Sequence, residues 1–421
     1  MKPGKNEKLN YKQLFLIGFG FFSTSIAWSM YNANVPLILK NYVSSATLIG
    51  LIMSIDNIFA VIFQPIFGAL SDKTRTRRGK RMPYILIGLP LCAVLFVFIP
   101  ATSALWALMA VVICFNFIMS AWRAPVVALM PDVTPPALRS KGNGIINLMG
   151  GVGSIIAFLA GGTLLNHFGM EVPFAVTSAV MMLAWCCLFF FVKEPSLPSV
   201  TEKVRQKTEE PAEPADRPAL SNKKSLNKSL LLILFAIFFW FAGYNAIETF
   251  FTTYATEVLG TSDGDASIIL AFFSVTLVAA AIPAGIVGTK IGRRRTILIG
   301  IVGLLIVFPV MYLIGDVTAA KILMLFGGAF WAFININSLP MVVEIGNDSI
   351  GKYTGYYYFF SASAAIVSPS LFGFIKDITQ NFNSLFVYSA VCFAAALICM
   401  LLVRHGEAEK PAPAEEPEFA E

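Results

Sequence analysis

The chain has 421 residues, of which 57% are hydrophobic and only 13% are charged. Soluble domains usually carry about 25% charged residues, so this composition excludes an ordinary soluble protein and favours a membrane protein. The net charge of +6 does not indicate nucleic-acid binding, because the basic residues lie between apolar runs, where they report membrane topology. The six cysteines lie inside apolar runs without metal-ligand spacing, so we expect no metal site and no cofactor.

Apolar runs of the length needed to cross a bilayer, about 20 residues each, occur in two sets of six. They begin near Leu14, Thr47, Tyr84, Leu105, Asn143 and Pro173, and then near Leu230, Ser267, Thr296, Lys321, Tyr353 and Ser384. The sequence therefore predicts an all-α membrane protein with twelve transmembrane helices. We expect two six-helix bundles, over residues 1–193 and 229–404.

Two polar segments flank the second bundle. Residues 194–228 are rich in Pro, Glu, Lys and Ser and predict a flexible linker, and residues 405–421 predict a disordered acidic tail. Lys and Arg concentrate in the N-terminal segment, in this linker and in alternate connections, which predicts that both termini and the linker are cytoplasmic. The basic N-terminal segment has no small-residue cleavage site, so we expect it to be retained.

An internal repeat supports the division into two halves. The basic connector Gln64–Pro83 follows the second run, and a shorter relative, Gly285–Arg295, follows the eighth. PVVALMPD at 125–132 in the fourth run likewise corresponds to PMVVEIGN at 340–347 in the tenth. Duplicated six-helix units are typical of secondary transporters, which bind their substrate between the halves near the bilayer midplane.

The connector carries a family resemblance. Its G-x-L-x-D followed by G-[RK]-R resembles the signature of the major facilitator superfamily, here Gly68, Asp72, Gly79, Lys80 and Arg81. The four residues inserted before Gly79, and the stretch at 123–145, resemble the sucrose–proton symporters and their glycoside–pentoside–hexuronide relatives. The resemblance implies a sugar or glycoside carrier that works by alternating access, as a monomer, in a plasma membrane, which we expect to be bacterial.

Two departures from that branch concern the coupling ion. Ala60 and Gln64 stand where melibiose-type relatives have paired aspartates for sodium, which favours protons or no coupling ion. Plant sucrose carriers have an arginine where this chain has Val127, and the nearest basic residue is Arg123. Coupling by the plant arrangement is therefore not predicted.

Charged groups inside predicted membrane helices are candidates for coupling, because each costs about 2.5–3.5 kcal/mol or more near the bilayer centre. Asp56, Arg123 and Glu248 lie in the second, fourth and seventh runs. One hypothesis is that Asp56, or in second place Glu248, gains and loses a proton as its surroundings change. The alternative is that Asp56 and Arg123 form an ion pair that only fixes the geometry of the bundle.

A sugar needs hydrogen-bonding amides and carboxylates together with aromatic faces. The first, seventh and tenth runs, which the resemblance assigns to the central cavity, offer such groups. The predicted binding residues are Tyr31, Asn32, Asn34, Tyr244, Asn245, Glu248, Trp331, Asn335 and Asn337. For each residue alone, helix packing or an interhelical hydrogen bond is the alternative.

The connector also predicts a cytoplasmic gate that breaks when the halves rock. The predicted gate residues are Gly68, Asp72, Arg77, Arg78, Gly79, Lys80, Arg81, Asp132 and Glu344. The alternative is that the basic residues only set topology. In the second half Thr289 stands in place of Asp72, so we expect a weaker gate there.

Other functions remain as alternatives. A carrier of a drug or another metabolite would have the same architecture, and a membrane nutrient sensor that does not transport is a further alternative. An enzyme is not expected, because the two histidines, His167 and His405, stand at the ends of runs and no nucleophile–base pair is evident. The expected partners are a small-molecule substrate, protons and the lipid bilayer.

Overall fold

The computed structural model describes residues 11–134, 139–192, 194, 223–345 and 350–404, and these ranges are almost wholly helical. Within them, 12 helical stretches are long and apolar enough to cross a membrane. Helices are expected there, because lipid offers the backbone no hydrogen bonds and each segment must satisfy its own N–H and C=O groups. The predicted fold class is confirmed.

Among the described residues the first half contains seven helices, because the second membrane-spanning stretch is divided at Ser54. The helices are α1 (Tyr11–Lys40), α2 (Ala46–Met53), α3 (Ile55–Lys73), α4 (Met82–Ala101), α5 (Leu105–Val133), α6 (Arg139–Phe168) and α7 (Glu171–Phe191). Successive membrane-spanning stretches run antiparallel, whereas α2 and α3 follow each other within one stretch.

The second half repeats this order with six helices. They are α9 (Lys223–Glu257), α10 (Asp263–Ile291), α11 (Arg293–Ile314), α12 (Val317–Ile345), α13 (Ile350–Thr379) and α14 (Ser384–Leu402). Helix α9 begins at Lys223, inside the segment 194–228 that the sequence predicts as a linker, while Glu194 at its other end is buried. Most of that segment and the predicted tail, 195–222 and 405–421, lie outside the described residues.

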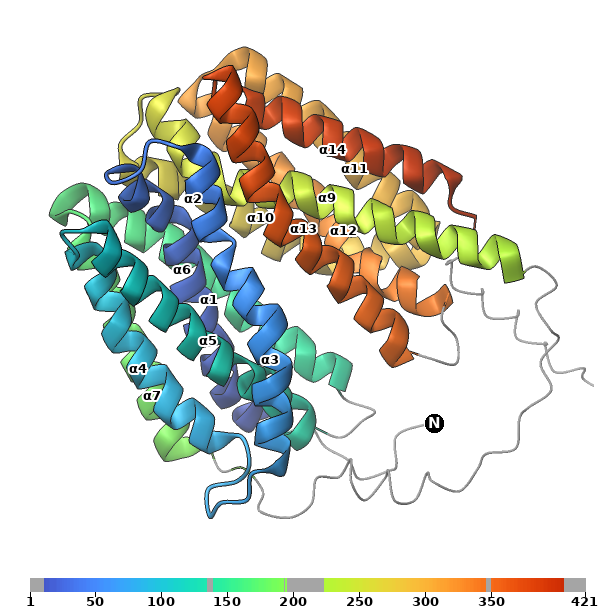
Figure 1. Cartoon of the computed structure of the whole chain (residues 1–421). Helices are drawn as coiled ribbons and strands as arrows, with labels where there is room; N and C mark the ends of the chain where they lie inside the picture. Colours follow the sequence, from blue (N-terminus) through green and yellow to red (C-terminus); the bar gives the residue numbers. More distant parts are fainter. Residues whose placement is uncertain (1–10, 135–138, 193, 195–222, 346–349, 405–421) are drawn as a thin grey trace, which may run out of the picture.

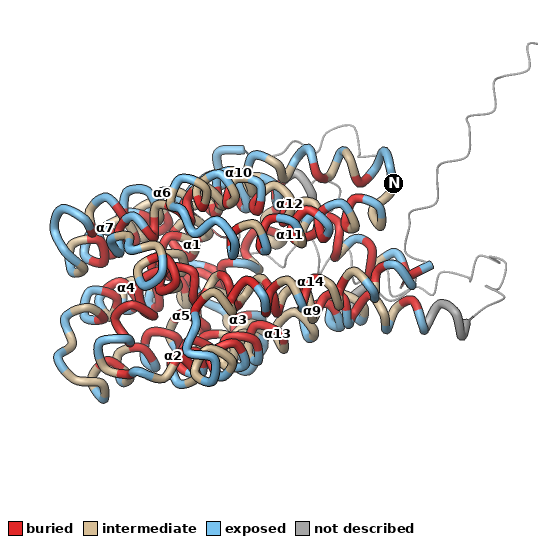
Figure 2. Tube along the Cα trace, turned by 90° about the horizontal axis from the view of Figure 1, so that it is seen from above, coloured by how far each residue is buried: buried red, intermediate tan, exposed pale blue. Residues whose placement is uncertain are grey.

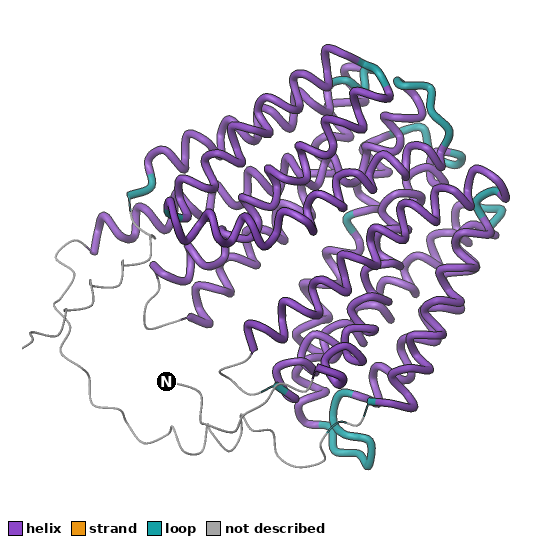
Figure 3. Tube along the Cα trace, turned by 180° about the vertical axis from the view of Figure 1, so that it is seen from behind, coloured by secondary structure: helices purple, strands orange, loops and turns teal. Residues whose placement is uncertain are grey.

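The two halves lie side by side as two bundles (Figure 1). We call the end where α7 ends and α9 begins the linker end, and the end where α1 ends and α2 begins the distal end. At the distal end α2 packs on α13 and α6 packs on α10, whereas the bundles diverge toward the linker end (Figures 1 and 3). The halves are therefore joined mainly through their distal portions.

Buried side chains gather on the helix faces that point into the bundles, and the outward faces are exposed (Figure 2). Trp122 and Phe174 are among the largest fully buried side chains of the first half, and Trp240 and Phe386 have that role in the second. Large apolar side chains such as Trp106 and Ile282 are exposed on the outside, as expected for surfaces that face lipid. The buried residues of the two halves belong to one continuous hydrophobic core.

Candidate functional site

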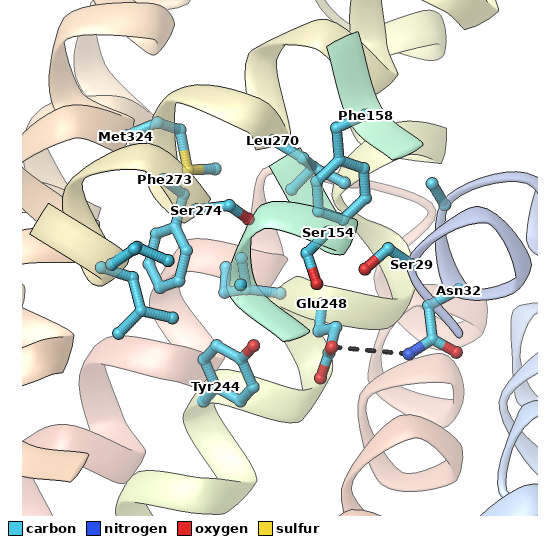
Figure 4. A pocket seen from close by; sticks show the side chains of 15 residues that line it. Ser29, Asn32, Ser154, Phe158, Tyr244, Glu248, Leu270, Phe273, Ser274 and Met324 are labelled. Atoms are coloured by element: carbon cyan, nitrogen blue, oxygen red, sulfur yellow. Dashed lines mark hydrogen bonds between the residues drawn. The ribbon is translucent and has the colours of Figure 1, made fainter. Parts of the chain in front are cut away.

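A cavity of about 120 Å³ lies between the two halves. It is lined from the first half by α1 and α6 and from the second by α9, α10 and α12 (Figure 4). Its lining residues are Ser29, Asn32, Ala33, Gly151, Ser154, Phe158, Tyr244, Ile247, Glu248, Leu270, Phe273, Ser274, Leu277, Val278 and Met324. Ligand pockets commonly measure about 300–1,000 Å³, so a solute would need this cavity to widen.

A hydrogen bond spans the two halves at one side of the cavity. The side-chain amide of Asn32 on α1 donates to the Glu248 carboxylate on α9, with Nδ2 and Oε1 3.4 Å apart (Figure 4). This separation is long for a hydrogen bond, so it is easily replaced by bonds to a solute. Tyr244, about one helical turn from Glu248, also lines the cavity. Three of the predicted binding residues therefore meet at one place.

The Tyr244 ring is held from behind by Trp331 on α12. The two rings are nearly parallel, with centroids 4.3 Å apart and planes inclined by 4°. Trp331 is fully buried and does not line the cavity, so its part is to fix the orientation of Tyr244. A fixed aromatic face of this kind can contact the C–H surface of a ring.

The other predicted binding residues are turned away from this cavity. Tyr31 is buried and receives a hydrogen bond from the Asn116 amide, at 3.1 Å. The side-chain amides of Asn34 and Asn245 donate to carbonyl groups of their own helices, at 2.9 Å and 2.7 Å. In this conformation these three side chains therefore bond to groups of the protein.

The tenth-run asparagines differ from each other. Asn337 is buried and donates to the Ala284 carbonyl on α10 at 3.1 Å, so it joins two helices of the second half. Asn335 is half-buried and is not among the residues that line the cavity. The structure thus gathers Asn32, Tyr244 and Glu248 and leaves the remaining members of the predicted set outside the cavity lining.

Several lining residues were not predicted. Ser154 and Phe158 come from α6, and Phe273 and Ser274 come from α10, helices that the sequence reasoning did not assign to the cavity. The one signal in the sequence for this part of the cavity was Gly151, because a glycine on α6 permits the close approach of Val278 on α10. Sequence alone did not indicate that the residues beside such a contact would face a cavity.

Asp56 stands in the first turn of α3, directly after the interruption at Ser54, and is 3% exposed. Its Oδ1 accepts hydrogen bonds from the Asn57 backbone N–H at 2.5 Å and from the Asn57 side chain at 2.6 Å. A carboxylate is favoured there, because the first N–H groups of a helix lack partners and carry partial positive charge. The Ser54 hydroxyl bonds to the Ile366 carbonyl of α13 at 2.8 Å, so the interruption touches the other half.

Arg123 does not pair directly with Asp56. Its guanidinium lies over the Trp28 ring, 5.1 Å from the ring centroid, and within the described ranges no carboxylate is within 4.0 Å of it. The ion pair considered from the sequence is therefore not formed in this conformation.

The basic connector organises the linker end of the first half through Arg81. The Arg81 side chain is 6% exposed, and its Nε donates to Asp132 at the end of α5 over 3.0 Å. Its other nitrogens bond to the Gly68 carbonyl, to Ser71 and to Asp72, all at the end of α3. One guanidinium thus ties three helix ends together, as its planar fork of donors permits.

The neighbours of Arg81 complete this network. Lys80 pairs with Asp132 at 3.2 Å, and the Glu194 carboxylate accepts the backbone N–H groups of Arg81 and Met82, at 2.8 Å and 3.1 Å. Gly79 has φ +105° and lies against Glu194, so a side chain would be strained and would collide there. Glu194, the first residue of the predicted linker, therefore belongs to the first half.

The remaining predicted gate residues lie apart from Arg81. Arg78 stacks on Phe189 at 4.1 Å, and Arg77 is exposed. In the second half Arg293, which follows Gly292 as Lys80 follows Gly79, pairs with Glu344 at 3.0 Å. Each of these contacts stays within its own half, so the described part of the chain contains no ion pair that bridges the halves at the linker end.

The fold and the cavity define a class: a membrane protein of two six-span bundles with a small-molecule site between them. The sequence profile of the Major Facilitator Superfamily matches residues 17–264 and 251–420. The chain belongs to this superfamily, and we conclude that it is a multi-pass membrane transporter.

Individual relatives are more distant. Multidrug resistance protein MdtG of Salmonella schwarzengrund (strain CVM19633) is 24% identical over 392 residues, which cover 91% of this chain and 93% of the relative. Among solved structures, a mutant of the nucleoside transporter NupG has a TM-score of 0.71 at 14% identity, covering 93% of this chain and 100% of that one. A bacterial homolog to the human lysosomal transporter Spinster has a TM-score of 0.66, also at 14% identity, covering 94% and 95%. These structures share the fold.

Proposed function

We propose that this protein is a secondary active carrier that binds a small organic solute between Asn32 and Glu248 and moves it by alternating access. The observation that carries the proposal is the cavity itself, whose lining comes from both halves. A solute held there would bond to both halves at once. Rocking of the halves would then expose it to each side of the membrane in turn.

The orientation follows from charge. Lys and Arg residues concentrate at the linker end, so we assign that end to the cytoplasm. We further propose that the chain lies in the plasma membrane and works as a monomer. Because the halves are joined mainly through their distal portions, this conformation corresponds to the carrier open toward the cytoplasm. In the opposite conformation the helix ends organised by Arg81 and Arg293 would approach each other and act as the cytoplasmic gate.

A sugar or glycoside is the first candidate for the solute. The Glu248 carboxylate, the Asn32 amide and the hydroxyl groups of Ser29, Ser154 and Ser274 offer donors and acceptors around one small space. Tyr244 adds an aromatic face whose orientation Trp331 fixes. Hydroxyl groups on a sugar would replace the long Asn32–Glu248 bond with shorter ones.

A solute with a larger apolar body is the second candidate. Phe158, Leu270, Phe273 and Met324 supply an apolar wall opposite the polar group at Glu248. Such a lining suits an amphipathic compound that places one polar group at the carboxylate. The name of the relative MdtG, a multidrug resistance protein, agrees with a compound of this kind.

We further propose that transport is coupled to protons through Asp56 in the first place and Glu248 in the second. Asp56 lies in α3 and Glu248 in the cavity lining. Neither carboxylate has a basic partner within 4.0 Å among the residues described.

Uptake into proteoliposomes tests these proposals. The purified chain would be tested with a panel of labelled mono- and disaccharides and with amphipathic dyes, with and without a pH gradient. Asn32→Ala should lower the affinity for the transported solute about tenfold, the loss of roughly one good hydrogen bond at a binding site. Asn245→Ala is the matched control, because that amide bonds to its own helix. An equal loss of affinity in both variants would contradict the proposal that the solute binds in this cavity.

A further inference from the structure

A carboxylate from one half caps a helix of the other half at the distal end. Asp377 on α13 accepts four hydrogen bonds from three consecutive residues at the start of α2. The donors are the Ser45 hydroxyl at 2.7 Å, the Ala46 N–H at 2.8 Å, and the Thr47 N–H and hydroxyl at 3.0 Å and 2.7 Å. The first N–H groups of a helix need such partners, which usually come from the same segment.

The same arrangement recurs on the other side of the pseudo-symmetric molecule. Asn166 stands two residues before the end of α6, as Asp377 does on α13. Asn166 accepts a hydrogen bond from the Ser262 hydroxyl at 2.7 Å and donates to Asp265 at 3.1 Å, both at the start of α10. Ser262 is the N-cap of α10, as Ser45 is the N-cap of α2.

Close backbone packing supports each of these contacts one helical turn away. Gly373, four residues before Asp377, lies so close to the backbone of Ala46 and Thr47 that a Cβ would collide with it. Gly162, four residues before Asn166, packs in the same way on Gly264. Two independent features, the capping bonds and the glycine contacts, therefore join the same pairs of helices.

We propose that Asp377 and Asn166 are two latches that hold the distal side closed, and that the charged Asp377 latch is the stronger. To open the distal side, the carrier must release both helix starts at once. Hydrogen bonds to a charged group are about twice as strong as neutral ones, and Asp377 makes more of them than Asn166. The inference rests on the proposed alternating access, but it concerns the balance between conformations and names no solute.

Hydrogen–deuterium exchange of the full chain, followed by mass spectrometry without substrate, tests this proposal. Each latch is broken in turn and exchange is measured elsewhere, because a lost cap raises exchange at its own helix start in any case. Asp377→Ala should raise exchange about tenfold or more at the start of α10, and should slow exchange at the linker ends of α3 and α10. Asn166→Ala should likewise raise exchange at the start of α2, but by a smaller factor.

Two further variants sharpen the test. Asp377→Asn gives the first latch the same side chain as the second and should have an effect between those of wild type and Asp377→Ala. Asp316→Ala is the matched control, because Asp316 is a distal aspartate that bonds to the Ala319 N–H of its own half at 2.9 Å. It should change exchange only at the start of α12.

The proposal is overturned if Asp377→Ala changes exchange only at α2. Its effect would then be local, as the effect of the control Asp316→Ala at α12 should be. It is also overturned if Asn166→Ala has the larger distant effect. Because no solute is added, failure to find a transported compound would count against the proposed function and leave the latch result standing.

Discussion

Arg81 and Arg293 each pair with a carboxylate at the linker end of their own half, yet their replacement by alanine should have unequal effects. Arg81 is buried and ties Asp132 to the end of α3, whereas the Arg293 and Glu344 side chains are 22% and 40% exposed. Breaking a buried pair costs about 3–5 kcal/mol, because it leaves a charge without its partner, while exposed pairs contribute at most about 1 kcal/mol.

The expected cost of Arg81→Ala is near the lower end of that range. The Asp72 side chain is 58% exposed, so water replaces part of its loss, and Lys80 remains 3.2 Å from Asp132. We therefore expect a loss of about 3 kcal/mol for Arg81→Ala and of about 1 kcal/mol or less for Arg293→Ala. Scaled as for domains of about 150–250 residues, these losses lower the melting temperature by about 6–12 °C and by about 4 °C or less.

Thermal unfolding of the detergent-purified chain, followed by tryptophan fluorescence, measures both values. Arg81→Lys serves as the control for charge, since lysine keeps the positive charge and loses the fork that reaches several acceptors. It should fall between wild type and Arg81→Ala. Equal melting temperatures for Arg81→Ala and Arg293→Ala would refute the reasoning and favour the alternative that the basic residues only set topology.

Three further predictions concern the cavity and its supports. Asp56→Asn should abolish accumulation driven by a pH gradient while solute exchange without a gradient continues; accumulation at the wild-type level would exclude Asp56 as the coupling group. Tyr244→Ala should weaken solute binding about tenfold and Tyr244→Phe much less, because the ring makes the predicted contact, and binding titrations can compare the two. Asn337→Ala should lower stability by about 1–2 kcal/mol through loss of its bond to the Ala284 carbonyl, with no direct effect on solute affinity, which unfolding and binding measurements separate.

The helices were predictable because a membrane imposes a simple rule on composition. Every spanning segment must be long and apolar, so twelve runs could be found without any knowledge of packing. The division at Ser54 was not predicted, because it changes the backbone without a proline or a polar run to mark it. It matters for function, since it puts Asp56 in the first turn of a helix in the interior of the bundle.

The site was predictable only in part, because the rotation of each helix about its own axis decides which of its polar residues face the cavity. Asn32 and Asn34 are two residues apart, so they point about 200° apart around α1, and only Asn32 faces Glu248. Asn245 and Glu248 likewise lie one turn apart, yet the Asn245 amide bonds to its own backbone. An amide in a membrane helix can satisfy itself in this way, so residue type alone does not separate a binding group from a packing group.

The two repeated halves differ in where their stabilising contacts lie. The first half has the buried Arg81 network at the linker end, and the Arg293–Glu344 pair of the second half is less buried. At the distal end the stronger capping residue, Asp377, comes from the second half and holds the start of α2 in the first. The linker ends are therefore organised within each half, whereas the distal ends are held between the halves. If rocking is the transport step, the first contacts to break are the capping bonds of Asp377 and Asn166, and the Arg81 network moves as part of a rigid body.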